Sequence, residues 1–280
     1  MGKGKTSRRK LSAETALAGL AFPLVDSAIE QAREIAREPS VEGLHQLRTT
    51  MRSLQSLWWF YRPLTGAGEY TQRRSTFKSI ANAAGRARDY DILLEMLRLR
   101  KQNTAVLAPE IQAIREAAME AGRGVLSPLG MQALLRQTLW QTSASLAARQ
   151  NQRPLRAFAD ARVAKSERQL RKLIEQAVRA KKPDFAAFHD VRKAGKKTRY
   201  LLELLGPVLS GNHQKTLARL KKSLKSLGDL NDVVASERLL LENPSLLSAI
   251  GKPGKVCHWF EKERQRRLSA SAYLLRKDWR

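Results

Sequence analysis

The chain has 280 residues, of which 42% are hydrophobic and 28% charged, so it can bury a sizeable core and is not a disordered polypeptide. Fifty-two Lys and Arg stand against 26 Asp and Glu, and the resulting net charge of +26 indicates a polyanionic partner. The sequence has no run of 18 apolar residues and only one cysteine, Cys257, which excludes a membrane-spanning helix and a disulfide framework and suits a reducing, cytoplasmic setting.

The first ten residues form a basic tail with five basic residues and no acidic one. Without this tail the chain keeps a net charge of +21, so the excess belongs to the folded body. The apolar stretch Leu17–Val25 follows, but Glu14 precedes it and Pro23 lies inside it. We therefore interpret this stretch as the start of the first helix and not as a signal peptide.

Apolar residues recur at three- and four-residue intervals along almost the whole chain, which is the spacing of amphipathic helices. Segments rich in Pro, Gly, Ser and Asn divide this pattern into about ten helices, and the sequence predicts an all-α protein. The breaks are expected at Pro39–Ser40, Arg62–Gly68, Gly85, Leu107–Pro109, Gly122–Pro128, Asn151–Pro154, Lys182–Pro183, Gly206–Pro207, Gly211–Asn212, Gly228, Asn243–Pro244 and Gly251–Gly254.

Two short motifs occur twice in the same order. The segment Leu44–Arg48 matches Phe188–Arg192 at an offset of 144 residues, and Gly85–Asp89 matches Gly228–Asp232 at an offset of 143. Two colinear matches at nearly one offset predict a duplicated helical protein. The predicted halves are residues 1–150 and 151–280.

The glycine that opens each copy of the second motif is expected to end a helix in the left-handed conformation. Asp89 and Asp232 are then expected to cap the next helix or to pair with an arginine such as Arg88. This is a structural role for both aspartates, not a catalytic one.

The second histidine-bearing helix carries a stripe of cations. With about 100° between successive residues, five basic side chains fall on or beside the face of one histidine. They are Arg192, Lys193, Lys196, Lys197 and Arg199, around His189. Like charges at this spacing repel each other and destabilise the helix, so the stripe needs another reason to exist.

Further basic residues follow the same logic on other predicted helices. They are His45, Arg48 and Arg52 on the first histidine-bearing helix, Arg88 in the first glycine motif, Arg162, Lys165 and Lys172 on the long helix before the second histidine, and Arg219 and Lys222 after it. If these faces converge, they line a positive groove whose Arg, Lys and His side chains donate to phosphate oxygens. The plainer interpretation is a solvated surface, but solvated faces normally mix Glu with Lys.

These motifs resemble those of the CHAD family, the conserved histidine α-helical domain. Its pattern, His-x-x-Arg-x-x-x-[Lys/Arg]-[Lys/Arg]-x-Arg, is complete after His189, whereas the first copy has Ser53 and Gln55 at two of the basic positions. The resemblance implies two pseudo-twofold-related helical bundles around a basic central pore or groove. It also implies non-enzymatic binding of inorganic polyphosphate without a cofactor, and association with polyphosphate or polyhydroxyalkanoate granules. The complete second copy predicts that most phosphate contacts come from that helix.

Two other functions remain open. A nucleic-acid-binding protein would share the charge, but aromatic residues make up only 6% of the chain and do not alternate with the basic stripe. A metal-dependent phosphohydrolase could use His45, His189, Asp190 and Asp232, although Asp190 aligns with Gln46 in the other copy. We therefore expect a protein without catalytic or metal-binding residues.

Overall fold

The chain folds entirely into helices in the part that this computed structural model describes, residues 11–101, 104–180 and 183–279. The basic tail lies outside the described residues. The first half contains α1 (Ala13–Arg37), α2 (Val41–Tyr61), α3 (Ala67–Ala83), α4 (Arg86–Leu99), the 3₁₀ helix η1 (Ala105–Leu107), α5 (Ala108–Leu126) and α6 (Pro128–Ala147). The second half contains α7 (Leu155–Arg179), α8 (Phe185–Leu205), α9 (Gln214–Glu242), α10 (Pro244–Ala249) and α11 (Pro253–Asp278). The predicted all-α class is confirmed, and no helix in these ranges is long and apolar enough to cross a membrane.

Most helix ends coincide with the predicted breaks, and local side chains account for several of them. Ser12 and Ser40 precede α1 and α2, where their hydroxyls accept hydrogen bonds from the backbone N–H groups of Thr15 and Gly43, at 3.1 and 3.0 Å. Such caps satisfy donors that the first turn of a helix leaves without a partner.

The break predicted at Gly228 is wrong, because α9 runs through this residue without interruption. Leu224 and Leu227 before the glycine and Leu230 after it are buried, and their packing outweighs the roughly 1 kcal/mol that glycine costs inside a helix. The left-handed conformation predicted for both glycines is also wrong, since no described glycine has a positive φ.

Gly85 does separate α3 from α4, but a close contact and not a left-handed turn explains the glycine. Its φ of −97° is right-handed, and a Cβ atom built there would lie 2.8 Å from Cζ of Arg48. The missing side chain therefore leaves room for the Arg48 guanidinium.

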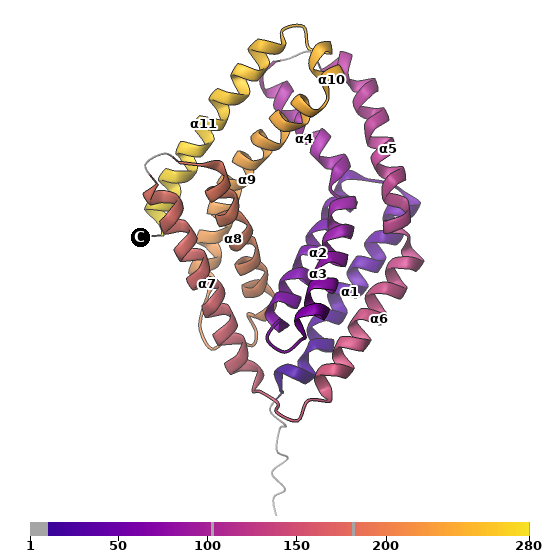
Figure 1. The fold of residues 1–280 in the computed structure, drawn as a ribbon, viewed down its shortest axis with the longest axis vertical. Helices are drawn as coiled ribbons and strands as arrows, with labels where there is room; N and C mark the ends of the chain where they lie inside the picture. The colour runs from indigo at the N-terminus through magenta and orange to yellow at the C-terminus, as the bar shows by residue number, and fades with distance from the viewer. Residues whose placement is uncertain (1–10, 102–103, 181–182, 280) are drawn as a thin grey trace, which may run out of the picture.

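The two sequence halves contain helices of matching length at the positions of the repeat. Helices α1 and α7 each have 25 residues, and α2 and α8 each have 21. Figure 1 shows most of the first half on one side of the molecule and α7, α8 and α11 on the other. The halves meet where α2 contacts α8, α1 contacts α7 and α4 contacts α9.

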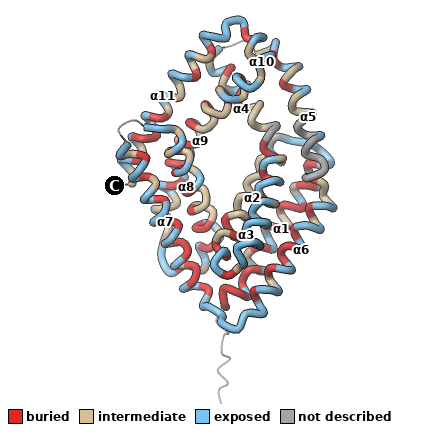
Figure 2. The backbone as a smooth tube through the Cα atoms, viewed as in Figure 1, coloured by how far each residue is buried: buried red, intermediate tan, exposed pale blue. Residues whose placement is uncertain are grey.

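Both hydrophobic cores draw residues from both halves. The larger core joins α1, α2, α3 and α6 to α7, α8, α9 and α11, and Figure 2 shows buried positions recurring along each of these helices. The smaller core packs Leu93, Leu97 and Ile111 of the first half against Val233 and Phe260 of the second. Both cores thus join the two halves, and the larger one contains the two histidine-bearing helices, α2 and α8.

Candidate anion-binding site

Helices α2 and α8 contact each other, and their cationic faces meet across the boundary between the halves. We call the resulting group the central cluster. It consists of His45, Arg48, Arg52, Arg88, His189, Arg192 and Lys196. Burial and, less strongly, the charges of Arg48 on the same helix and Arg192 on α8 together lower the pKa of Arg52 to about 10. Cations that the sequence separates by more than 130 residues therefore share one site.

Lys196 has the most strongly perturbed charge of the cluster. Burial is the main cause, and the positive charges of Arg192, Arg52 and Arg48 add to it, so that the pKa of Lys196 falls to about 6. The carboxylate of Asp232 opposes this shift only in part. At neutral pH the Lys196 amine is therefore mainly uncharged until a negative partner arrives.

Both histidines are held in the neutral form by the same effects. Burial lowers the pKa of His45, and Arg88 and Lys196 lower it further. Burial also lowers the pKa of His189, with added contributions from Lys193 and Arg192. The Nδ1 atom of His189 is buried and has no hydrogen-bond partner within the described ranges.

Asp89 and Asp232 are among the carboxylates next to the cluster. Asp89 pairs with Arg48, with 3.4 Å between Oδ1 and Nη1, and Asp232 acts on Arg192 and Lys196. Burial raises the pKa of Asp232, and the charges of Arg192 and Lys196 oppose this shift. Nε of Arg192 is buried without a hydrogen-bond partner among the described residues, so the cluster has donor capacity that the protein itself does not use.

Arg162 was predicted to bind the ligand, and the structure gives it a different role. Its Nε donates to the carbonyl of Phe60 at 2.9 Å, one Nη donates to the carbonyl of Trp59, and only 6% of the residue is exposed. Its guanidinium also lies 3.9 Å from the ring centroid of Trp59. Arg162 is therefore part of the C-terminal cap of α2, and we remove it from the candidate ligands.

Lys197 points to the same junction and not to the central cluster. Its Nζ lies 4.1 Å from the ring centroid of Trp59, the ring that Arg162 also contacts. The same Nζ donates to Oε1 of Gln169 at 2.9 Å. Burial and, less strongly, the charges of Arg162 and Lys165 together lower its pKa to about 8. The cation–π contacts of Trp59 thus hold α2, α7 and α8 together.

Replacing Arg162 with methionine is expected to destabilise the protein by about 3–5 kcal/mol, because two buried carbonyls at the end of α2 lose their donors and the Trp59 contact is lost. Urea unfolding measures the change. Lys165→Met on the exposed side of α7 is the control and should stay within about 0.5 kcal/mol of the wild type. A stable Arg162→Met protein would show that the cap is dispensable.

The other predicted ligands lie outside the central cluster. Lys193 pairs with Asp190 at 2.6 Å, Arg199 with Glu203 at 2.9 Å, and Lys222 with Asp278 at 3.1 Å. Lys165, Lys172 and Arg219 are exposed on α7 and α9. Because the additional cations of α8 have these other partners, α2 and α8 each bring one histidine and two cations to the cluster. We expected α8 to supply most of the phosphate contacts, but α2 and α8 contribute equal numbers of residues to the cluster.

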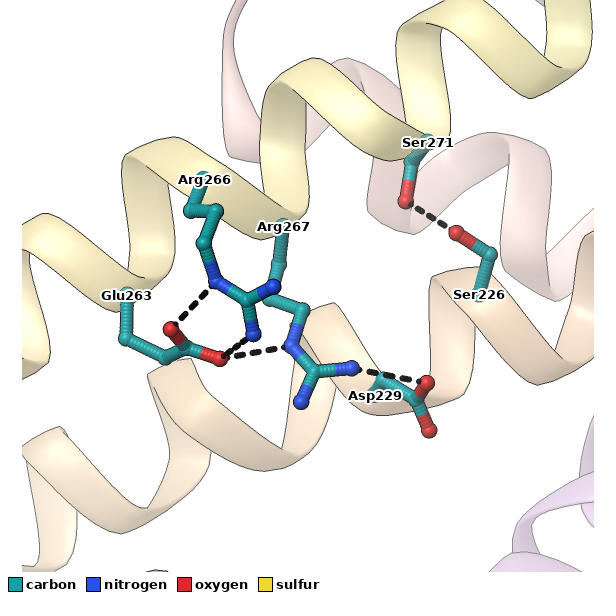
Figure 3. A network of polar contacts seen from close by, with 6 residues as sticks. All are labelled: Ser226, Asp229, Glu263, Arg266, Arg267 and Ser271. Atoms are coloured by element: carbon teal, nitrogen blue, oxygen red, sulfur yellow. Dashed lines mark hydrogen bonds and ion pairs between the residues drawn. The ribbon is translucent and has the colours of Figure 1, made fainter. Parts of the chain in front are cut away.

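A network between α9 and α11 fixes the rotation of α9 about its axis (Figure 3). Arg267 donates to Asp229 at 2.9 Å and to Glu263 at 2.7 Å, and Ser226 bonds Ser271 at 2.8 Å. The side of α9 with Ser226 and Asp229 therefore faces α11. Here each arginine has a carboxylate partner, in contrast to the central cluster.

The rotation of α9 identifies two further lysines. Helical spacing had placed Lys225 on one basic side with Lys215, Arg219 and Lys222, whereas Lys221 was not selected. Lys221 and Lys225 precede Gly228 and Asp232 at spacings that place all four on one side of the helix. Asp232 faces the central cluster, both lysines are exposed, and a Cβ atom at Gly228 would meet nothing within 4 Å. The sequence signal for Lys221 and Lys225 was their helical spacing from Asp232. Lys222, which was selected, lies on the side toward α11.

The ligand set of a metal-dependent phosphohydrolase is not assembled in the described residues. Within these ranges, no group of three His, Cys, Asp or Glu side chains could hold a metal ion. Asp190 instead pairs with Lys193 on the exposed side of α8.

Comparisons with known proteins agree with this geometry. Residues 22–241 match the CHAD domain family. The fold is similar to the crystal structure of the CHAD domain from the plant Ricinus communis, with a TM-score of 0.74 and 22% identity over 95% of this chain and 92% of that one. It is also similar to PptA from Streptomyces chartreusis, with a TM-score of 0.61 and 16% identity over 96% of this chain and 99% of that one. No curated protein matches the sequence. Because the family match covers most of its length, the chain belongs to the CHAD domain family.

Proposed function

We propose that this protein binds inorganic polyphosphate at the central cluster and catalyses no reaction on it. The observation that carries the proposal is the convergence of cations from both halves, whose charges add to burial in lowering the pKa of Arg52 and Lys196 although nearby carboxylates oppose them. Bringing like charges together in a partly buried site costs free energy. A linear polyanion would offset this cost through charge-assisted hydrogen bonds to several cations at once.

The surroundings of the cluster favour a chain of phosphates over a nucleic acid. Recognition of single-stranded nucleic acid uses exposed aromatic rings on which bases stack. Trp59, in the last turn of α2, is instead occupied by Arg162 and Lys197. Lys221 and Lys225 would extend the phosphate path along α9, and the association with granules stays a prediction.

A titration with polyphosphates of increasing length tests the proposal. Affinity should rise with length until the polymer spans the cluster and then level off. With about four phosphates neutralised, affinity should fall roughly 50- to 150-fold between about 50 and 200 mM salt, because bound counterions are released. Isothermal titration calorimetry gives both results.

Competition and turnover assays separate the alternatives. Polyphosphate should displace single-stranded or duplex DNA when the two are compared at equal phosphate concentration. The opposite ranking would support a nucleic-acid-binding protein. Phosphate release that depends on added Mn²⁺ would contradict the non-enzymatic function.

A further inference from the structure

Two helical stretches without any charged residue lie side by side on α1 and α6. Residues 15–25 and 137–147 contain no Asp, Glu, Lys or Arg, although these residues make up 28% of the chain. Helix α1 packs against α6, at the outer edge of the first half in Figure 1. This surface is distinct from the central cluster, which lies on α2, α4 and α8.

Polar contacts fix how the two stretches face each other. Asp26 pairs with Arg136 at 3.5 Å, and Arg33 donates to Gln132 at 2.8 Å, so the residue numbers rise on α1 as they fall on α6. The helices are antiparallel. One helical turn further on, the same register places Phe22 beside Trp140.

The two aromatic side chains are exposed and form the centre of an apolar surface. Phe22 is 53% exposed and Trp140 is 71% exposed. Ala18, Gly19 and Ala144 continue the surface by one more turn and are exposed as well. We call these five residues the Phe22–Trp140 patch. Large aromatic rings exposed together on a charge-free surface are typical of an interaction site.

The segment that follows α6 adjoins one end of this patch and is basic. The N-terminus of α1 and the segment after α6 meet there, because the N–H of Ala13 donates to the carbonyl of Arg153 at 2.8 Å and the N–H of Leu155 to that of Leu11 at 3.0 Å. Residues 148–156 contain three basic residues, Arg149, Arg153 and Arg156, and no acidic one, and the sequence before Leu11 has five more basic residues. The patch therefore combines exposed aromatic rings with positive charge at its border.

We propose that the Phe22–Trp140 patch docks on the surface of an anionic lipid layer. The two rings would enter the boundary between headgroups and acyl chains, where amphipathic indoles are stable, and the basic segment after α6 would meet the headgroup phosphates. A second copy of the chain is a poorer partner, because two molecules of +26 repel each other. The proposal does not depend on polyphosphate binding.

Vesicle sedimentation with the full chain tests the proposal. The probes are vesicles of phosphatidylcholine alone and of phosphatidylcholine mixed with phosphatidylglycerol. The test variant is Phe22→Ala with Trp140→Ala, and the matched control is Tyr273→Ala, which removes a ring that is 67% exposed on α11. A second control, Arg192→Ala with Lys196→Ala, weakens the central cluster.

The expected result is binding to the mixed vesicles that persists when salt screens the charges. The patch variant should partition at least roughly tenfold more weakly than the wild type, since two rings no longer leave water. Both controls should partition like the wild type. Quenching of tryptophan fluorescence by brominated lipids should occur in the wild type and decrease in the patch variant.

Three outcomes would overturn the proposal. The first is that the wild type does not bind the mixed vesicles. The second is equal partitioning of the patch variant and Tyr273→Ala, which would leave charge alone as the cause. The third is a change of mass in sedimentation equilibrium confined to the patch variant, with lipid binding intact, which would assign the patch to a second copy of the chain. Circular dichroism verifies that each variant is folded.

Discussion

Replacing Lys196 with methionine is expected to stabilise the protein and to weaken polyphosphate binding at the same time. Lys196 is partly buried beside three arginines, and their charges together with burial depress its pKa to about 6. Methionine keeps a similar volume but has no amine that must lose its proton on folding, and replacing buried ionisable groups by apolar side chains stabilises proteins by up to about 4 kcal/mol. Loss of one charged donor should weaken binding roughly 10- to 100-fold.

Thermal or urea unfolding and calorimetric titration measure the two effects on the same protein. Lys165→Met on the exposed side of α7 is the matched control, and it should change neither quantity by more than a factor of about two. The opposite signs of the two effects are the diagnostic result. A Lys196→Met protein that is less stable than the wild type would mean that the lysine holds the fold together.

Polyphosphate binding should strengthen as the pH falls from 8 to 6. In the free protein, burial and neighbouring cations hold the pKa of Lys196 at about 6 and keep those of His45 and His189 below their usual value. A bound polyanion favours the protonated forms and raises all three pKa values. Binding therefore takes up protons, and affinity rises by up to about tenfold per pH unit for each proton taken up.

Calorimetry in buffers of different ionisation enthalpy counts these protons. We expect net uptake at pH 7, and we expect Lys196→Met to reduce it. The stability of the free protein should change in the opposite direction, because the unfolded lysine holds its proton up to about pH 10 whereas the folded one has lost it above about pH 6. Stability should therefore rise with pH over that interval. Proton release on binding would contradict the arrangement of the central cluster.

Sequence reasoning predicted the helices and the cationic faces well because both depend on local spacing. The i, i+3 and i+7 positions of His189, Arg192 and Lys196 share a face in any α-helix. The structure adds that the corresponding face of α2 meets this one, which depends on packing between distant segments. The internal repeat was the one signal for this pairing.

Helical spacing alone did not predict the role of a cation whose side chain faces a neighbouring helix. Arg162 shares a face with Lys165, yet only the arginine is buried. The signal that could have separated them is the apolar context, since Phe158, Ala159 and Val163 around Arg162 all belong to the core. Lys222 could not be assigned this way, because its partner Asp278 lies 56 residues away in the sequence. Gly228 shows the same limit for helix breaks, because a glycine alone does not tell whether packing on both sides keeps the helix intact.

The shared cores also bear on how the protein is made. A chain still emerging from the ribosome has α1, α2 and α6 before α7 and α8 exist to cover them, so their apolar sides lack the neighbours that the second half supplies. Arg48 and Arg52 are present at that point, but Arg192 and Lys196 are not. The central cluster therefore assembles only late in translation, once α8 docks on α2.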